Sequence, residues 1–257
     1  MASVTIVLPT RNRPEEVAQA LERVAAQTHP ELELVLVRDG GSPLGERAMA
    51  ILGRMEFPVT ITEHEDPPHG LAASRNRGIS EARGDAVAFL DDDDLWEPDH
   101  TARLAAALER DPEADVVYSD AAILEVESGR SRILAHDFDL DVFGKDSFIA
   151  PSAMAVRRGA LDRFGLFDTE IPYSEDWDWL MRVAVGGGTI ARVPGASVTI
   201  RIHSGGMSQL SADPERLRLR QESLDLIAKR YGLERMELKT FWEVAETLCP
   251  QANDSTR

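Results

Sequence analysis

The chain has 257 residues, enough for one large hydrophobic core at about 150 residues per domain. Hydrophobic residues make up 43% and charged residues 28%, the composition of an ordinary soluble globular protein. The 28 Lys and Arg against 45 Asp and Glu give a net charge of −17, which disfavours diffuse binding to nucleic acid or an anionic membrane.

No stretch approaches the ~20 apolar residues of a spanning helix, and the N-terminal sequence lacks the pattern of a secretory signal. A single cysteine, Cys249, excludes an internal disulfide and a multi-cysteine zinc site. Together these features predict a reduced, cytoplasmic location.

Strands and helices alternate over the first hundred residues. Short aliphatic runs predict strands at residues 4–8, 32–37, 59–62 and 86–90, of which the first and the last read as buried. Helices are predicted from Pro14, with Asn12 as a suitable cap, and at residues 47–52, 71–82 and 98–109. This alternation is typical of βαβ units, and it predicts an α/β fold with a mostly parallel central sheet flanked by helices.

The second half has a less regular pattern. Further strands are predicted at residues 116–118, 122–126, 152–156, 190–193 and 197–202. Helices are predicted at residues 159–164, 174–185, 214–230 and 233–247. With no internal repeat or flexible linker, we expect one domain over residues 1–208 and a helical C-terminal extension over residues 209–257.

The acidic run Asp91-Asp92-Asp93-Asp94 is the strongest chemical signal. Acidic runs usually form solvated surfaces, but a buried strand delivers this one to the carboxyl edge of the predicted sheet, where ligands bind in such folds. Like charges within ~4–6 Å disfavour ionisation. Mg²⁺ or Mn²⁺ would remove that repulsion and attract phosphate oxygens, so the run favours a metal–diphosphate site.

A second acidic pair, Glu175-Asp176, lies in the segment YSEDWDW. The pair could merely interact with the dipole of the helix that follows. However, Tyr173, Trp177 and Trp179 surround it, and aromatic faces beside a carboxylate suit a sugar-like acceptor with a base in reach of its hydroxyl. We therefore expect an acceptor site here.

Two further positions carry weaker signals. His203 ends a predicted strand and precedes a Gly-Gly loop, where a neutral imidazole could bind a metal or a phosphate oxygen, although a lone histidine is more often structural. Asp39 follows the second strand and could accept a hydrogen bond from a nucleobase. Arg75 and Asn76 could reach the base or the phosphates; alternatively, Arg75 neutralises nearby carboxylates.

These segments, in this order, resemble the family 2 glycosyltransferases, which are enzymes of the GT-A fold. The matching segments span roughly residues 4–208 and read VTIVLPTRNRP, LELVLVRDGGS, GLAASRNRGISEARGDAVAFLDDDDLWEPD, SEDWDW and RIHSGGMS. The resemblance implies a Rossmann-like sheet, a nucleotide-sugar donor, Mg²⁺ or Mn²⁺, inversion at the anomeric carbon and a cytoplasmic-side reaction. It also implies a nucleotide-binding half to about residue 120 and an acceptor half at about residues 121–208.

The resemblance also implies a role for each motif. Asp176 would be the catalytic base. Asp93 would ligate the metal, and Asp91 and Asp92 would face the ribose and the metal-bound waters. His203 would meet the metal or the diphosphate.

Contacts with the donor or acceptor are expected of Pro9, Thr10, Arg11, Asp39, Arg75, Glu175 and Trp177. Two departures from the family pattern fall in the nucleotide pocket. Arg38 replaces a frequent aspartate, and Arg11 replaces a frequent aromatic residue, although a guanidinium can also stack on a base. UDP-sugar is the first expectation, and GDP- or dTDP-sugar stays open.

Two alternatives from other classes stay open. A sugar-phosphate nucleotidyltransferase would also use carboxylates and a metal, but the sequence lacks a basic, Gly-rich triphosphate loop. A non-catalytic module that binds nucleotide or sugar is disfavoured by the joint presence of Asp39, Asp91, Asp93, Asp176 and His203. The expected acceptor is a glycan, a glycolipid or a small metabolite. A homodimer stays open, and no nucleic acid partner is expected.

Overall fold

The computed structural model describes residues 1–64, 68–203 and 213–250. The strands of the first half are β1 (Val4–Thr10), β2 (Leu32–Arg38), β3 (Val59–Glu63) and β4 (Ala86–Phe89). Those that follow are β5 (Leu95–Trp96), β6 (Val116–Glu125), β7 (Ser131–Leu134), β8 (Met154–Arg157) and β9 (Ile190–Ile202). In the described part of the chain they form one sheet in the order β3-β2-β1-β4-β8-β6-β9-β5, with β7 paired to β6 outside this path.

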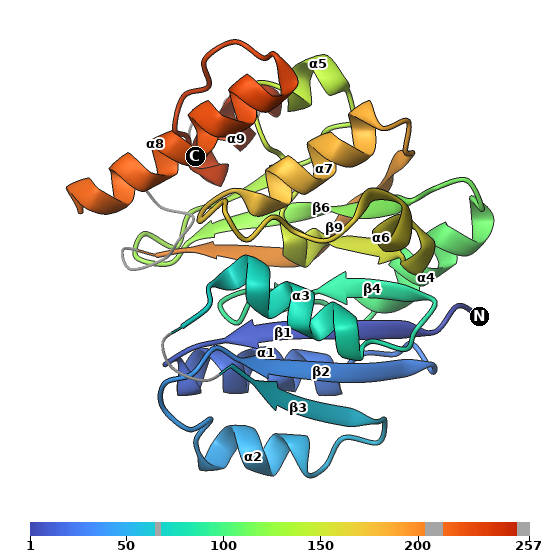
Figure 1. Ribbon diagram of the computed structural model, residues 1–257. Coiled ribbons are helices and arrows are strands. Elements are labelled where there is room, and N and C mark those ends of the chain that lie inside the picture. The colour runs from blue at the N-terminus through green and yellow to red at the C-terminus, as the bar shows by residue number, and fades with distance from the viewer. Residues whose placement is uncertain (65–67, 204–212, 251–257) are drawn as a thin grey trace, which may run out of the picture.

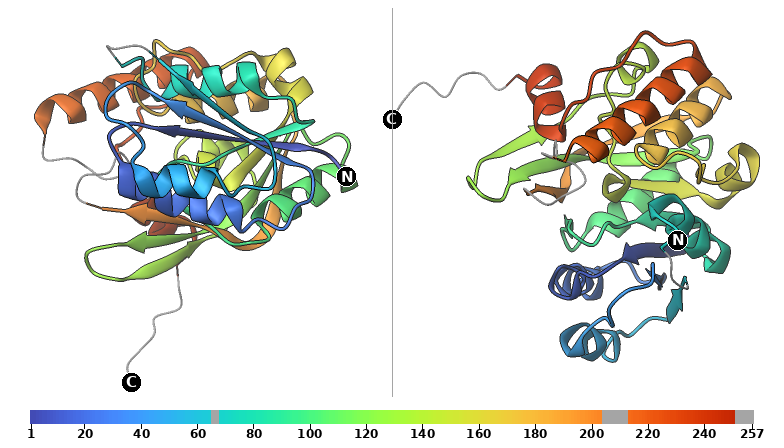
Figure 2. Two further views of the ribbon diagram at one scale, coloured as in Figure 1. Left: turned by 90° about the horizontal axis from the view of Figure 1, so that it is seen from below. Right: turned by 60° about the vertical axis from the view of Figure 1, so that its left-hand side comes forward.

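Helices cover both faces of the sheet (Figures 1 and 2). On one face lie α3 (Leu71–Glu81), α6 (Arg158–Phe164) and α7 (Glu175–Val185); on the other lie α1 (Pro14–Ala25), α2 (Glu46–Leu52) and α4 (His100–Arg110). The remaining helices are the short α5 (Leu140–Phe143), α8 (Pro214–Tyr231) and α9 (Phe241–Leu248). The predicted α/β architecture is confirmed.

The first half of the sheet is parallel because each strand is followed by a crossover helix. β1 pairs in parallel with β2 and β4, and β2 pairs in parallel with β3. All seven residues of β1 are buried, as expected of a strand covered on both faces. The carboxyl ends of β1, β2 and β4 therefore meet at one edge, which is where the sequence placed the polar loops.

The second half of the sheet is mixed. β8 is antiparallel to β4 and to β6, whereas β6 and β9 are parallel. The strands predicted separately at residues 116–118 and 122–126 are one strand, β6, and those predicted at 190–193 and 197–202 are also one, β9. A register shift between Ser119 and Ala121 allows this continuity. At the shift Asp120 accepts hydrogen bonds from Arg192 and from the backbone N–H of Gly195.

Three other expectations were wrong in detail. The strand predicted from residue 152 begins at Met154, because Pro151–Ala153 forms a 3₁₀ turn. The helix predicted over residues 233–247 is limited to α9, which begins at a capping box between Thr240 and Glu243. Asn12 does not cap α1; its Oδ1 accepts instead from the backbone N–H of Ser42 at 2.7 Å. The boundary predicted at residue 208 lies outside the described residues.

The C-terminal helices pack beside α7 and the β6–β7 hairpin (Figure 1). Arg230 and Tyr231 of α8 both hydrogen-bond Oδ1 of Asp178 in α7, at 2.7 and 3.0 Å. Trp242 of α9 lies under the guanidinium groups of Arg130 and Arg132. These contacts attach the extension to the acceptor half predicted from the sequence.

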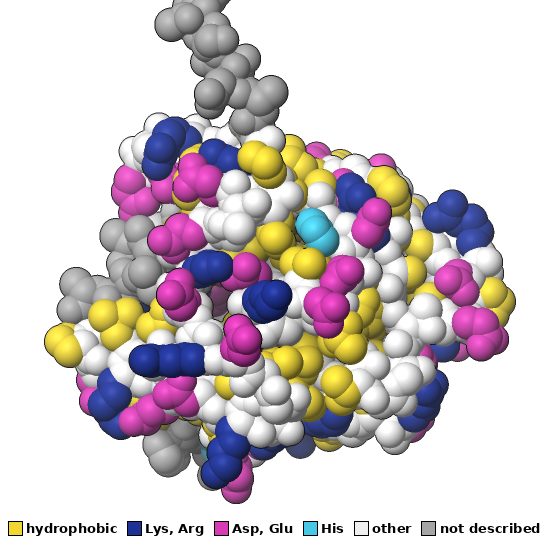
Figure 3. Space-filling view, turned by 90° about the horizontal axis from the view of Figure 1, so that it is seen from above, with side chains coloured by type: hydrophobic (Ala, Val, Ile, Leu, Met, Phe, Trp, Pro, Cys, Tyr) yellow, Lys and Arg dark blue, Asp and Glu magenta, His cyan; other side chains and the backbone are white. Residues whose placement is uncertain are grey.

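Two surface properties bear on function. Among the residues that the structure describes, none of the helices combines the length and apolarity needed to cross a bilayer. On the face seen from above in the orientation of Figure 1, acidic and basic side chains are interspersed with hydrophobic ones (Figure 3). The net charge of −17 is thus not expressed as a uniformly acidic surface on this side.

Candidate active site

The acidic run follows β4 at the carboxyl edge of the sheet, and its carboxylates have different partners. Asp92 is 6% exposed and accepts from the Thr10 hydroxyl at 2.7 Å and from Arg13 Nη1 at 2.9 Å. Asp93 accepts from the same Arg13 nitrogen at 2.7 Å. Burial raises the pKa of Asp92 to about 6 despite the neighbouring guanidinium. A protein cation therefore already lies between two of the carboxylates.

The last aspartate of the run has a structural role. Asp94 is buried, and its carboxylate accepts from the backbone N–H of Arg201 in β9 and from the hydroxyl of Ser152. Burial and the adjacent Asp93 and Asp91 raise the pKa of Asp94 well above the ordinary value. This side chain links the acidic loop to β9. Because it is buried, it is not accessible to a ligand from solvent.

Arg75 connects the acidic run to the second acidic pair. It is 1% exposed, donates to Asp91 Oδ1 at 2.6 Å and forms a buried ion pair with Glu175 at the start of α7. Burial raises the pKa of Glu175 to about 7 although Arg75 opposes this shift. Of the two roles considered for Arg75 from the sequence, neutralisation of carboxylates is the one for which the structure shows contacts.

Asp176, the second residue of α7, follows Glu175 directly. The N-cap residue of α7, Ser174, has a left-handed backbone conformation with φ of 61°, which is strained for a non-glycine residue and is found more often at functional sites. Asp176 is half-buried, and no other described side chain donates a hydrogen bond to its carboxylate. Burial raises the pKa of Asp176 above the ordinary value, a shift in the direction that would suit a general base.

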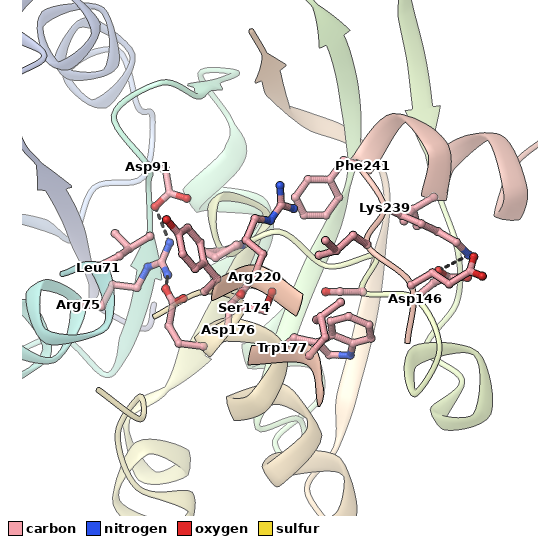
Figure 4. Close-up of a pocket in the computed structure, with 18 residues that line it drawn as sticks. Leu71, Arg75, Asp91, Asp146, Ser174, Asp176, Trp177, Arg220, Lys239 and Phe241 are labelled. Atoms are coloured by element: carbon pink, nitrogen blue, oxygen red, sulfur yellow. Dashed lines mark hydrogen bonds and ion pairs between the residues drawn. The ribbon is translucent and has the colours of Figure 1, made fainter. Parts of the chain in front are cut away.

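A cavity of about 160 Å³ joins these groups. Figure 4 shows Arg75 and Asp91 at one end, Asp176 and Arg220 in the middle, and the ion pair of Lys239 with Asp146 at the other end. Apolar parts of its wall come from α7, α8, α9 and the segments before α7 and between α8 and α9; they include Tyr173, Trp177, Leu224, Leu238, Phe241 and Val244. The C-terminal extension thus completes a cavity whose acidic end belongs to the sheet.

The aromatic cluster of YSEDWDW is divided between the cavity and the core. Trp177 lines the cavity but is only 5% exposed, and its indole N–H donates to the carbonyl of Phe143 at 2.8 Å. Trp179 is fully buried on the other side of α7, where its N–H donates to the carbonyl of Gly165 at 2.7 Å. The expectation that the tryptophans present open faces to a sugar is wrong for Trp179, because helical periodicity directs it into the core.

The residues expected to bind the nucleotide lie at the ends of β1 and β2. Thr10 and Arg11 line a small pocket between the loops that follow these strands, whereas Pro9 is buried within β1. The carboxylate of Asp39 accepts from the backbone N–H groups of His69 and Gly70 at 2.8 and 3.0 Å. These bonds fix the loop before α3, and each oxygen keeps a further lone pair for a ligand donor.

Comparison with known proteins identifies the family. Residues 5–165 match the model of the family described as "Glycosyl transferase family 2". The chain belongs to this family. The glycosyltransferase is 31% identical over 246 residues to "Uncharacterized glycosyltransferase YwdF" of Bacillus subtilis, covering 93% of this chain and 87% of that protein. It is 30% identical over 215 residues to "PGL/p-HBAD biosynthesis glycosyltransferase" of Mycobacterium tuberculosis, covering 83% and 82%.

Solved structures support the fold. The glycosyltransferase superposes on residues 1–349 of Staphylococcus aureus TarS in complex with UDP-GlcNAc with a TM-score of 0.68 and 22% identity, covering 88% of this chain and 64% of that one. It spans 39% of a longer TarS chain, at the same TM-score and 18% identity. The mannosyltransferase PcManGT of Pyrobaculum calidifontis, in complex with GDP-Man and Mn²⁺, gives a TM-score of 0.59 at 20% identity, covering 77% and 56%. These similarities confirm the GT-A fold of the glycosyltransferase.

The divalent metal implied by the resemblance has two candidate ligands in the glycosyltransferase. Asp93 Oδ2 and His203 Nε2 lie 3.4 Å apart, and a carboxylate with an imidazole suits Mn²⁺. In the described part of the chain no three His, Cys, Asp or Glu side chains are grouped as a metal site. The donor set therefore fits an ion whose other ligands are phosphate oxygens and water, as is usual for Mg²⁺ in phosphate-binding sites.

Sequence reasoning missed two groups of residues in this glycosyltransferase. Arg13 contacts the acidic run across 79 and 80 residues of chain, and no local pattern marks that contact. The cavity residues of the C-terminal extension, such as Arg220 and Phe241, lie in a segment that was predicted to be helical but was assigned no site residue. Arg13 and Arg75 pair with carboxylates of the acidic run; for Arg75 this was one of the two roles considered from the sequence.

Proposed function

We propose that this glycosyltransferase moves a sugar from a nucleoside-diphosphate sugar to an acceptor hydroxyl with inversion at the anomeric carbon. One observation carries the proposal: Asp176 and Asp91 line the same cavity. The candidate base and the edge of the sheet where a donor diphosphate would bind therefore adjoin one space. A reaction between two substrates needs this arrangement, because each reacting group must approach the other from a separate site.

A uridine nucleotide is the first expectation for the donor. The TarS structures contain UDP and UDP-GlcNAc, and PcManGT contains GDP-Man, so both bases occur on this fold. In the present chain Thr10 and Arg11 would contact the nucleotide, and Asp39 would accept from the base. Because Arg11 and Arg38 depart from the usual family pattern, GDP- and dTDP-sugars remain part of the proposal.

The chemistry is a single displacement. Asp176 accepts the proton of the acceptor hydroxyl while the oxygen attacks the anomeric carbon, and the bond from that carbon to the diphosphate oxygen breaks with its electron pair. The nucleoside diphosphate leaves, and attack from the opposite face inverts the configuration. Glu175, paired with Arg75, holds the start of α7 in place and keeps Asp176 at the cavity.

Asp93 and His203 would hold Mg²⁺ or Mn²⁺. When bound, the ion supplies positive charge for the diphosphate oxygens on which negative charge develops. Asp91 and Asp92 would accept hydrogen bonds from the ribose and from metal-bound water. Asp92 is held in position for this by Thr10.

The acceptor would occupy the cavity beside α7. Its volume of about 160 Å³ resembles the engineered cavity of roughly 150 Å³ that holds one benzene ring, so a single ring of the acceptor fits. Apolar side chains of α8 and α9 face this ring, and Trp177 contributes a small part of the wall. A glycan, a glycolipid or a small hydroxylated metabolite can present such a ring.

A thermal-shift screen of UDP, GDP and dTDP, with and without Mn²⁺, would identify the nucleotide of the donor. A nucleotide at 100 times its Kd adds about 2.7 kcal/mol to the unfolding free energy, which gives a clear shift. Release of the matching nucleotide from its sugar conjugates is then measured with candidate acceptors, and NMR of the product gives the anomeric configuration.

The role of Asp176 is tested in the same assay. Asp176→Asn is expected to lower transfer by ~10²–10⁴-fold and to leave the nucleotide-induced thermal shift intact, because a base acts in the chemical step. Asp162→Asn, a matched change at an exposed position of α6, is expected to leave both unchanged. Transfer by Asp176→Asn at the wild-type rate would remove Asp176 from the mechanism.

A further inference from the structure

Arg13 occupies the position between two carboxylates that a divalent ion would neutralise. One nitrogen, Nη1, lies 2.9 Å from Asp92 Oδ1 and 2.7 Å from Asp93 Oδ2. The Arg13 side chain is 27% exposed, so it is partly accessible to solvent. Both carboxylates raise the pKa of Arg13, so it stays cationic at every physiological pH.

The local structure gives Arg13 no other function. It is the N-cap residue of α1, but its side chain makes no capping bond, and Pro14 follows it. A cation at the N-terminus of a helix is unfavourable, because that end of the helix carries partial positive charge. Glu15 and Glu16 in the first turn follow the usual preference, whereas Arg13 opposes it. The acidic run is therefore what holds the guanidinium in place.

Arg13 and a metal ion would compete for one atom. Asp93 Oδ2, which accepts from Arg13, is also the oxygen nearest to His203 Nε2, at 3.4 Å. An ion held by Asp93 and His203 would lie a few ångströms from the guanidinium. Even at the dielectric constant of water, a unit charge about 4–5 Å from a divalent ion opposes binding by at least about tenfold.

We propose that Arg13 is the resting counter-cation of the diphosphate site. It opposes the binding of a divalent ion to the free enzyme and transfers its hydrogen bonds to the diphosphate when the donor enters with its metal. The negative charge of the diphosphate then compensates both cations at once. Arg13 is thus a positioning residue that couples metal binding to donor binding; the second half of this inference rests on the proposed function.

The test is the binding of Mn²⁺ alone, measured by calorimetry on the nucleotide-free full chain. Arg13→Gln is expected to bind Mn²⁺ at least about tenfold more tightly than the wild type. Arg13→Lys keeps the charge and is expected to stay within about threefold of the wild type. Arg23→Gln, at an exposed position near the end of α1, removes the same charge away from the site and is the matched control.

A double variant covers the case in which Arg13→Gln does not fold. Arg13→Gln/Asp92→Asn removes the guanidinium together with one of its two partners, so the net charge of the site stays unchanged and only Asp93 loses its guanidinium partner. It is expected to bind Mn²⁺ more tightly than Asp92→Asn alone. An affinity unchanged from the matched parent in whichever variant folds would overturn the inference, because a purely structural Arg13 has no effect on Mn²⁺.

The two proposals fail separately. If the wild type transfers sugar but removal of Arg13 does not tighten Mn²⁺ binding, the counter-cation role is wrong and the transfer reaction stands. If removal of Arg13 tightens Mn²⁺ binding but no nucleotide sugar is ever used, the counter-cation role stands and the proposed function is wrong.

Discussion

Arg75 of α3 and Glu175 of α7 form a buried ion pair although 100 residues of chain separate them. Arg75 also binds Asp91, so one guanidinium links the acidic loop after β4 to the start of α7. The pair therefore fixes the distance between the proposed donor edge and the proposed base. Its environment makes it costly to break, because both side chains are almost completely buried.

Removal of the Arg75 charge is expected to destabilise the fold. Arg75→Met leaves Glu175 buried without a partner, and breaking a buried pair from one side costs about 3–5 kcal/mol. Arg75→Met/Glu175→Gln is expected to recover part of this loss, because the uncompensated buried charge is gone. Urea unfolding at pH 7.5 measures both.

Arg77 supplies the matched control on the same helix. It is largely exposed and pairs with Glu81 one turn further along, so Arg77→Met is expected to cost less than 1 kcal/mol, in the range of roughly 0–1 kcal/mol for surface pairs. An Arg75→Met variant as stable as Arg77→Met would contradict the structural role assigned to the buried pair.

Glu175 is expected to give the fold a specific pH dependence. Burial raises its pKa from 4.5 to about 7 in the folded state, so between these values the folded chain holds more protons than the unfolded chain. The free energy of unfolding therefore falls as the pH rises through this window, by at most about 1.4 kcal/mol per pH unit for one proton, and is flat above it. The contribution of Glu175 is greatest at low pH.

Glu175→Gln removes this slope. Unfolding free energies at pH 5, 6, 7 and 8 are expected to show the variant gaining stability relative to the wild type as the pH rises. Asp92, whose pKa is raised to about 6, contributes in the same direction and is present in both proteins, so it cancels in the difference. Parallel curves for the two proteins would show that Glu175 does not titrate in this range.

Asp178 is expected to hold the C-terminal extension on the domain. Its carboxylate is fully buried and accepts from Arg182 within α7 and from Arg230 and Tyr231 of α8. Asp178→Ala is expected to cost about 3 kcal/mol, which corresponds to roughly 100-fold faster hydrogen exchange if α8 opens locally. Hydrogen-exchange mass spectrometry of α8 measures this directly.

The control for this prediction lies on α8 itself. Arg218→Met removes three contacts with Glu215 and Glu222, but all three side chains are exposed. Exchange in α8 is expected to change little, because exposed i,i+3 and i,i+4 pairs contribute only about 0.2–0.5 kcal/mol. Unchanged protection of α8 in Asp178→Ala would show that apolar packing alone holds the extension.

The sequence predicted the carboxyl edge of the sheet well because local signals define it. Each aliphatic run predicted as a strand in the first half is a strand, and each is followed by a loop that the parallel sheet brings to one edge. The positions of Asp39 and Asp91 follow from that rule alone. The pair Glu175-Asp176 was singled out because it stands among aromatic residues, and the structure places both residues at the cavity, whereas Trp179 lies in the core.

The partners of these residues could not be predicted from the sequence. Arg13 and the acidic run meet through the packing of α1 against the sheet, and Arg75 meets Glu175 through the packing of α3 beside α7. No periodicity encodes such contacts, since they depend on where whole elements lie. Asp178 had a local signal that was not used: Arg182 follows it at i+4, the spacing of an ion pair on a helix.

The acceptor wall is expected to depend on Phe241, the first residue of α9. Phe241 lines the cavity, and loss of an aromatic contact worth ~1.5–3 kcal/mol predicts that Phe241→Ala raises the acceptor KM by about tenfold or more. Because the contact is equal in ground and transition states, kcat and the donor Kd are expected to stay at wild-type values. Steady-state kinetics with the acceptor found in the transfer assay give the acceptor KM and kcat.

The next residue, Trp242, is the matched control. The guanidinium carbons of Arg130 and Arg132 lie 4.8 and 5.2 Å from the centre of its ring, and Trp242 is not among the residues that line the cavity. Trp242→Ala should therefore lower the melting temperature without raising KM, and an equal rise in KM for both variants would show that α9 acts through its overall stability and not through contact with the acceptor.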